Sequence, residues 1–216
     1  MDQKDKLKEL VKSIQKSVEN DEVTSYIISG AIEALNKIHK KYVYDHDKFP
    51  KLLNTDEFKD DSTDKPSNLA EALLWKLGKW KSYKKFAEQF TNDQSKSTKT
   101  DVVFFAFARH LKDSSNPIYD QHAIRSVWAI CHQGFNSEEK NKCKGLLFDG
   151  KGKWKQTGTG QYSVDCYKIF LTHIDSLANE NLSKREIDLL LMPLGQALKD
   201  NSKNYDDFCY LCGWDK

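Results

Sequence analysis

The chain has 216 residues, of which 31% are charged, 38% are hydrophobic and 12% are aromatic. This length and aromatic content are sufficient for a packed core, and they exclude an intrinsically disordered chain. The net charge of +2, from 34 basic and 32 acidic residues, excludes a global field that would draw the protein onto nucleic acid or a membrane, so any such binding requires a local patch.

Apolar residues recur at spacings of three and four along the N-terminal part of the chain, which predicts helices. The first helix carries the stripe Leu7–Val18, which could pack internally or against another chain. A second helix is expected from about Val23 to Lys41. Acidic and turn residues then predict a long surface loop over about 44–66. Two short helices follow, over 67–78 and 82–90.

The most hydrophobic stretch of the chain is Asp101–Leu111. Its length and its valine and phenylalanine content would also suit a buried strand. Arg109 and His110 near its end favour a helix, because positive charge is stabilised at a helix C-terminus. We therefore predict a buried central helix here, followed by another helix from Asp120 to Cys131.

The C-terminal part continues the helical pattern, with a basic glycine-rich loop at about 149–160. Pro193 is expected to kink the last long helix, and the aromatic tail 205–214 is expected to dock on the body. No internal repeat or linker divides the sequence, which predicts a single all-α domain of roughly eight helices over residues 1–216. Three more helices complete the prediction: 137–148, 163–177 and 183–198.

The cysteines and the absence of targeting segments favour a cytoplasmic protein. No signal peptide begins the chain, and no stretch approaches the ~20 apolar residues of a membrane span. Cys209-x-x-Cys212 could bind zinc or act as a redox pair, but no second pair has ligand spacing, so buried thiols are favoured and no metal or cofactor is expected. The five cysteines are expected to be reduced: Cys131, Cys143, Cys166, Cys209 and Cys212.

The segment Pro117–Arg125 carries most of the functional signal. A proline and two apolar residues place Asp120 at the expected N-terminus of a helix. Backbone amides and the positive helix end favour a carboxylate at that position. His122 and Arg125 follow on or just past the first turn.

This pattern, an apolar helix, a turn and then Pro-x-x-Asp-x-His-x-x-Arg, resembles the signature of the helix-hairpin-helix DNA glycosylases of base-excision repair. The resemblance implies an all-α fold, DNA binding and cleavage of the N-glycosidic bond of a damaged base, with Asp120 stabilising the cationic sugar or positioning the nucleophile. It also implies that Lys99, or Lys96 as the alternative, is the nucleophile of a lyase. Arg125 or His122 would hold the DNA backbone or the carboxylate.

A second candidate DNA contact lies in the basic glycine-rich loop. Lys153 and Lys155 flank Trp154 there. Lysines interleaved with an aromatic ring are suited to phosphate contact combined with base stacking. The same residues would equally suit an ordinary solvated loop.

A non-enzymatic hypothesis stands beside the glycosylase. In it, Asp120 only caps its helix and the chain is a helical interaction or accessory protein of a bacterial defence or stress system. The family hairpin reads Leu-Pro-Gly-Val-Gly, whereas Thr91–Thr98 contains no glycine, which favours this alternative. Self-association through the N-terminal helix would belong to it. A zinc- or redox-dependent regulator built on Cys209 and Cys212 is a third hypothesis.

Overall fold

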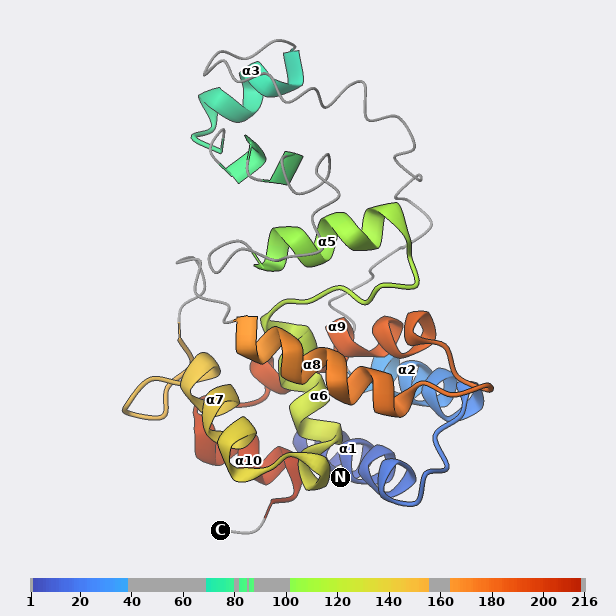
Figure 1. Cartoon of the computed structure of the whole chain (residues 1–216). Coiled ribbons are helices and arrows are strands. Elements are labelled where there is room, and N and C mark those ends of the chain that lie inside the picture. The colour runs from blue at the N-terminus through green and yellow to red at the C-terminus, as the bar shows by residue number, and fades with distance from the viewer. Residues whose placement is uncertain are drawn as a thin grey trace.

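The computed structural model describes residues 2–38, 69–79, 82–84, 86–87, 102–155 and 164–214 (Figure 1). Within these ranges the chain forms helices, turns and isolated bridges, which confirms the all-α prediction. The predicted surface loop at 44–66 lies outside them. The helices are α1 (Gln3–Glu19), α2 (Ser25–Ile38), α3 (Leu69–Lys76), α5 (Val102–Lys112), α6 (Gln121–Ile130), the 3₁₀ turn η3 (His132–Gly134), α7 (Ser137–Leu147), α8 (Val164–Leu177), α9 (Lys184–Asp200) and α10 (Tyr205–Cys212).

Several helices begin where the sequence supplies an N-cap side chain. Asn136 and Ser183 open α7 and α9 with complete capping boxes, because Glu139 and Glu186 return a hydrogen bond to the cap backbone. Asn204 caps α10 through its side chain, which accepts a hydrogen bond from the Asp207 backbone N–H. The aromatic tail is therefore a helix, which its sequence pattern did not predict. α9 continues as one helix through Pro193.

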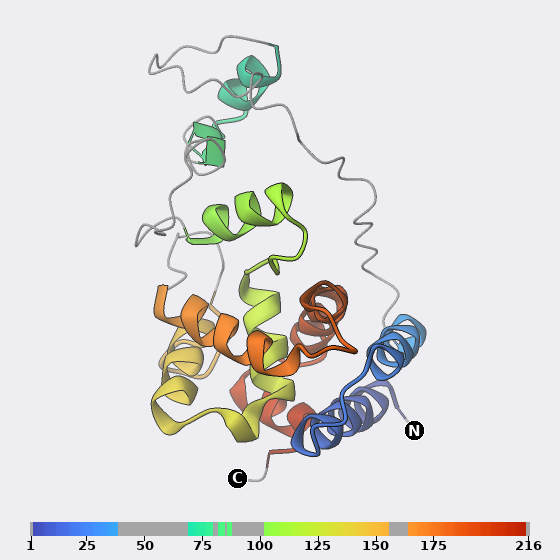
Figure 2. The same cartoon turned by 45° about the vertical axis from the view of Figure 1, so that its right-hand side comes forward.

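The short helix α6 is the centre of the fold. Every residue of it from 123 to 130 is buried, and its neighbours are α1, α7, α8 and above all α9 (Figure 2). The crossing with α9 is close because position 195 is glycine: a Cβ there would come within 2.1 Å of the His122 carbonyl oxygen. α9 therefore fixes the N-terminal turn of α6, where Asp120 lies.

The hydrophobic segment 102–112 is a helix, α5, which confirms the preferred interpretation over the strand. Both views place α5 across the top of the bundle, with α3 beyond it (Figures 1 and 2). Phe105 on its inner face meets the Tyr167 ring of α8 edge-on at 6.3 Å between centroids. Phe104 and Phe107 pack against Phe86 instead. The covering of α5 on both sides explains why its sequence has almost no polar face.

The apolar stripe of α1 is used inside the molecule. Leu7, Val11 and Ile14 are buried, and α1 packs against α2, α6 and α10. Of the two alternatives, packing inside the molecule or against another chain, the structure shows packing inside the molecule. The buried residues of this stripe are therefore not available for the self-association that was expected through the N-terminal helix. Within the described ranges, no helix combines the length and the apolar character needed to cross a membrane.

Candidate functional site

Asp120 is the N-cap residue of α6. Its backbone is extended, and its Oδ1 accepts hydrogen bonds from the backbone N–H groups of His122 (2.7 Å) and Ala123 (2.9 Å). The residue is partly exposed. Among the described residues no donor contacts Oδ2. The helix end therefore holds the carboxylate through one oxygen and leaves the other available to a ligand.

The segment that leads to Asp120 is held from two sides. The backbone N–H of Ile118 donates to Oδ1 of Asp188 on α9 at 3.0 Å. The imidazole Nδ1 of His110, on the last turn of α5, lies 2.7 Å from the carbonyl oxygen of Asn116. Because a carbonyl can only accept, His110 carries its proton on Nδ1. The position of Asp120 thus depends on both α5 and α9.

Asp188 is a buried carboxylate close to this segment, with 1% of its surface exposed. Burial raises its pKa to about 7 and the negative charge of Asp120 adds to that rise, whereas the Ile118 N–H and the charge of Arg185 oppose it. Within the described chain, no donor reaches its Oδ2. Asp188 was not among the residues predicted from the sequence. The available signal was an aspartate on the otherwise apolar face of α9.

His110 is a neutral imidazole in this cluster. Burial lowers its pKa, and the nearby charge of Arg185 lowers it further, while the Asn116 carbonyl acts in the opposite direction. Arg185 Nη1 lies 3.2 Å from Nε2, which accepts the hydrogen bond. The 4.0 Å separation between His110 Nδ1 and Asp188 Oδ2 is therefore a contact of a neutral ring with a carboxyl group, and not an ion pair.

Arg125 is completely buried and joins three parts of the fold. Its Nη1 donates to the carbonyl oxygen of Gly195 at 2.7 Å and lies 3.0 Å from Nδ1 of His122. Its guanidinium carbon lies 4.4 Å from the centroid of the Trp154 ring. A side chain with 0% exposure cannot reach a DNA phosphate, so the expected direct contact between Arg125 and DNA is not possible in this structure, where Arg125 contacts Gly195, His122 and Trp154.

His122 stands between Arg125 and Asp120. It is half-buried, and burial lowers its pKa. The charge of Asp120 opposes this effect, whereas Arg125 and Lys199 contribute to it. The neutral ring accepts from Arg125 and remains partly accessible beside Asp120. Of the two residues expected to hold DNA or the carboxylate, His122 is the one whose exposure permits direct contact.

The three candidate residues of the basic loop, Lys153, Trp154 and Lys155, have different environments in the structure. The Trp154 Nε1 donates to the Ser202 carbonyl at 2.9 Å, and the ring packs on Phe148 and Phe208 as well as on Arg125. Trp154 is therefore partly buried and packs against the hydrophobic core. The expectation that its ring stacks on a base is corrected, because Arg125 and Phe148 pack on that ring. The lysines on either side, Lys153 and Lys155, are exposed, and Lys155 Nζ donates to the Gly145 carbonyl.

The two lysines expected as the nucleophile, Lys99 and Lys96, lie outside the described residues. Among the side chains that the structure describes, no group of three or more His, Cys, Asp or Glu is placed to hold a metal ion. All five cysteines lie within the described ranges, and none of them forms a disulfide. Cys212 is fully buried, and burial raises its pKa well above the usual value. A thiol in that environment is a poor nucleophile and a poor metal ligand.

Comparisons of the chain with protein-family models, with curated proteins and with solved structures gave no match. Function is therefore inferred from the side chains around Asp120. Three features define this site: a partly exposed carboxylate at a helix N-terminus, a neutral half-exposed His122 beside it, and a buried second carboxylate at Asp188.

Proposed function

We propose that the protein is a divergent DNA-glycosylase-like protein that binds DNA and cleaves the N-glycosidic bond of a damaged base. The observation that carries this proposal is the carboxylate of Asp120. It follows the proline turn after an apolar helix, it is fixed by two backbone N–H groups through Oδ1, and it is partly exposed.

Such a carboxylate has the properties that glycosidic cleavage requires. As the bond to the base breaks, the sugar becomes an oxocarbenium-like cation, and a fixed negative charge beside it lowers the barrier. Because the backbone already holds Asp120 in place, no reorganisation is needed when that charge develops. His122, half-exposed beside it, would contact the sugar-phosphate backbone, and Lys99 would act as the nucleophile if the protein also cleaves the abasic strand.

DNA binding would depend on cations near the site that are at least partly exposed. Lys199 on α9 is close enough to His122 to influence its pKa, and Lys153 and Lys155 are exposed on the loop whose Trp154 packs on Arg125. Contacts of lysine with phosphate release counterions, so binding is expected to weaken steeply with salt.

Incision of fluorescent duplexes tests the proposal. The panel comprises undamaged, abasic, 8-oxoguanine and uracil duplexes, each measured with the wild type and with Asp120→Asn at two salt concentrations. Asparagine keeps the capping hydrogen bonds but removes the charge. We expect the variant to lose incision and to retain salt-sensitive binding.

A matched control separates catalysis from capping. Asp2 caps α1 by accepting from the Asp5 backbone N–H, so Asp2→Asn removes one charge from another N-cap. This control is expected to incise like the wild type. Full incision by Asp120→Asn would contradict the proposed mechanism, and absence of both incision and salt-sensitive binding by the wild type would contradict the whole proposal.

The second candidate function is a non-enzymatic interaction protein. Among the described residues, large apolar side chains are exposed on α2 and at the end of α3: Tyr26 is 87% exposed, Leu73 58% and Leu77 62%. Exposed apolar residues of this size can contact a partner protein. Absence of incision and of DNA binding, together with binding of a protein partner that the double variant Leu73→Ser, Leu77→Ser abolishes, would favour this function over the glycosylase.

A further inference from the structure

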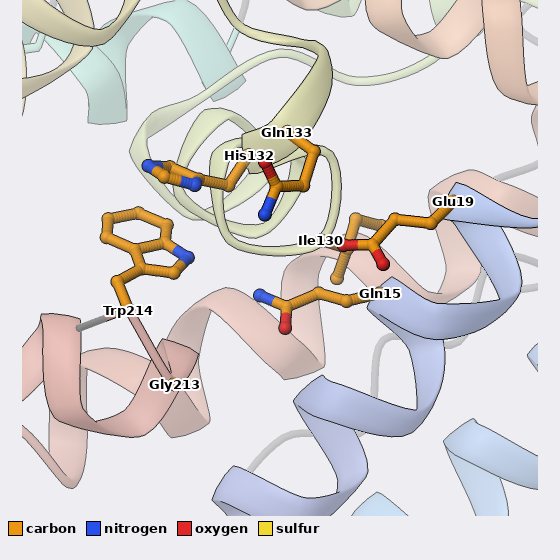
Figure 3. A pocket seen from close by; sticks show the side chains of 7 residues that line it. All are labelled: Gln15, Glu19, Ile130, His132, Gln133, Gly213 and Trp214. Atoms are coloured by element: carbon orange, nitrogen blue, oxygen red, sulfur yellow. The ribbon is translucent and has the colours of Figure 1, made fainter.

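A pocket of about 290 Å³ lies at the C-terminal end of α6, whereas Asp120 lies at the N-terminal end of the same helix (Figure 3). The end of α1 and the turn after α10 form its other sides. Small-ligand pockets begin at roughly this volume, so there is room for a group of a few heavy atoms. The lining side chains are Gln15, Glu19, Ile130, His132, Gln133 and Trp214.

The chain after α10 turns back so that Trp214 packs on the bundle. Gly213 ends α10 in the left-handed conformation, with a φ of 66°, and the backbone N–H of Trp214 donates to the Cys209 carbonyl at 3.0 Å. The indole stacks on the His132 ring at 3.9 Å between centroids, and the Trp128 ring lies 5.0 Å from it. Contacts with two rings fix the orientation of the indole.

The indole N–H of Trp214 is a buried donor. Within the described residues, its Nε1 atom is buried and forms no hydrogen bond. A buried N–H group without a partner is destabilising, and nearly all such groups in proteins are paired with protein, water or a ligand. Figure 3 shows this nitrogen on the edge of the ring that faces Gln15 and Gln133. The pocket therefore holds a donor in a fixed direction, and a ligand that fits supplies an acceptor.

The charges around the pocket disfavour an anionic acceptor. Glu19 contributes an exposed carboxylate to the rim, and the carbonyl groups at the ends of α6 and α10 carry partial negative charge. Burial, with the charge of Lys140, lowers the pKa of His132 to about 4, so its ring adds no positive charge at pH 7. The stem of Lys12 runs along Gly213, but Lys12 does not line the pocket. A neutral acceptor is therefore favoured.

Gln15 supplies an acceptor to the lining. Its Nε2 donates to the carbonyl oxygens of Ala129 (2.7 Å) and Cys212 (2.9 Å). Because carbonyl oxygens only accept, both amide hydrogens are used there and Oε1 remains as an acceptor. Ile130 adds an apolar contact. A neutral group with one strong acceptor, an N–H donor and a short apolar part fits this lining, and these are the features of a carboxamide.

We propose that this pocket binds a carboxamide group, whose carbonyl oxygen accepts from Trp214 Nε1, whose N–H donates to Gln15 Oε1 and whose alkyl part contacts Ile130. Gln133 is exposed, and a surface side chain changes rotamer rapidly, so it can admit the group. The amide belongs to a free small molecule or to an asparagine or glutamine side chain of a partner protein, and the recognising chemistry is the same. This site is separate from Asp120 and does not depend on the function proposed for it.

The test uses propionamide as the probe and the full chain labelled with ¹⁵N. The indole N–H signal of Trp214 reports occupancy by NMR, because a new hydrogen bond moves it downfield. The indole N–H of Trp154, which already donates to the Ser202 carbonyl at 2.9 Å, is the internal reference. Propionate, which has the same size with a negative charge and no N–H, is the ligand control.

We expect a saturable downfield shift of the Trp214 signal with propionamide, no shift of the Trp154 signal, and weaker binding of propionate. The absence of a saturable shift at Trp214 would overturn the proposal and leave its N–H to solvent. Equal affinities for propionamide and propionate would overturn the assignment of a neutral ligand.

Two variants locate the binding site, with the backbone N–H signals of Gly213 and Gln133 as reporters. Trp214→Phe removes the donor and keeps a ring that can stack on His132. Loss of one neutral hydrogen bond is expected to weaken propionamide binding by about three- to tenfold. Glu19→Gln, the matched control, should change it by less than about twofold, because the ligand is neutral and Glu19 is exposed.

Unchanged affinity in Trp214→Phe would overturn the proposal, and a larger loss in Glu19→Gln than in Trp214→Phe would show recognition by charge and overturn it as well. The wild-type titration remains decisive if Trp214→Phe does not fold.

A peptide arm distinguishes the two sources of the amide. An acetyl-Ser-Asn-Ser-amide peptide is compared with the same peptide carrying leucine, which has the shape of asparagine without its polar atoms. Tighter binding of the asparagine peptide than of propionamide and of the leucine peptide would identify a side-chain amide of a partner protein as the ligand. Weaker binding of the asparagine peptide than of propionamide would identify a free small amide.

Discussion

Gly195 and His122 are in direct backbone contact where α9 crosses the first turn of α6. A Cβ on residue 195 would lie 2.1 Å from the carbonyl oxygen of His122 and 2.6 Å from its carbonyl carbon. Neither group is the movable end of a side chain, so the two helices would have to separate. The same crossing holds the Arg125–Gly195 hydrogen bond and lies next to Asp120. The geometry of the candidate site therefore depends on the absence of a side chain at Gly195.

Gly195→Ala should destabilise the fold strongly. Overpacking of a core by one methyl group costs about 1–3 kcal/mol, and more where backbone must move. Urea unfolding followed by tryptophan fluorescence measures the change. The matched controls are Gly30→Ala in α2 and Gly145→Ala in α7, where an added Cβ has no neighbour within 4 Å. Both controls should be neutral or stabilising by up to about 1 kcal/mol because alanine favours helices. An unchanged free energy of unfolding in Gly195→Ala would show that α6 and α9 are farther apart at this position than the structure indicates.

Much of the local structure could be predicted from the sequence. Helix starts depend on residues within four positions of each other, so the capping box of Ser183 and Glu186 and the capping position of Asp120 follow from spacing alone. The helical interpretation of the hydrophobic segment was also correct from Val102 onward, because the basic residues that indicated a helix C-terminus lie within the segment itself. These features need no knowledge of distant parts of the chain.

The surroundings of the site could not be predicted in the same way. Arg125 is buried by Gly195 and Trp154, and Asp188 reaches Ile118 across 70 positions of sequence. A buried arginine and an exposed arginine have the same helical spacing. Whether a charged residue faces solvent or a neighbouring helix is decided by packing between segments, which a single sequence does not contain.

Arg125→Met should destabilise the fold by roughly 2–4 kcal/mol, because it leaves the Gly195 carbonyl and His122 without their donor. Methionine preserves most of the volume, so the loss reports the polar contacts and the stacking on Trp154. Lys153→Met, at an exposed position of the neighbouring loop, should change stability by less than about 0.5 kcal/mol. Thermal and urea unfolding measure both variants. Similar stabilities would mean that Arg125 is not a structural centre.

Asp120→Ala and Asp120→Asn should separate the capping role of this residue from its charge. Alanine removes the acceptor for the His122 and Ala123 N–H groups and should cost about 1 kcal/mol of unfolding free energy, whereas asparagine should cost only a few tenths. If the same two variants are equally inactive in DNA incision, the carboxylate charge is required beyond the cap. If asparagine is as active as the wild type, Asp120 serves only as a cap.

Asp188→Asn should change how stability depends on pH. The pKa of Asp188 is raised from 3.8 to about 7 in the folded protein, so the folded state keeps a proton that the unfolded state releases between these values. The contribution of Asp188 to stability therefore falls as pH rises from about 4 to 7, and the full cost, on the order of a few kcal/mol, is present above pH 7. Asparagine carries no charge and can still accept from the Ile118 N–H.

The variant should consequently gain stability over the wild type as pH increases from about 5 to 8, as measured by urea unfolding at each pH. His110 acts in the other direction: its pKa is lowered by burial, so its contribution falls as pH drops below about 6.5 in both proteins. The difference between the two stability curves reports Asp188 together with the change in the pKa of His110, whose Nδ1 lies 4.0 Å from the Asp188 carboxylate. The pKa of Asp188 also depends on the charges of Arg185 and Asp120. Parallel curves would show that Asp188 does not titrate in this range, and the buried carboxylate would then need a partner that compensates its charge.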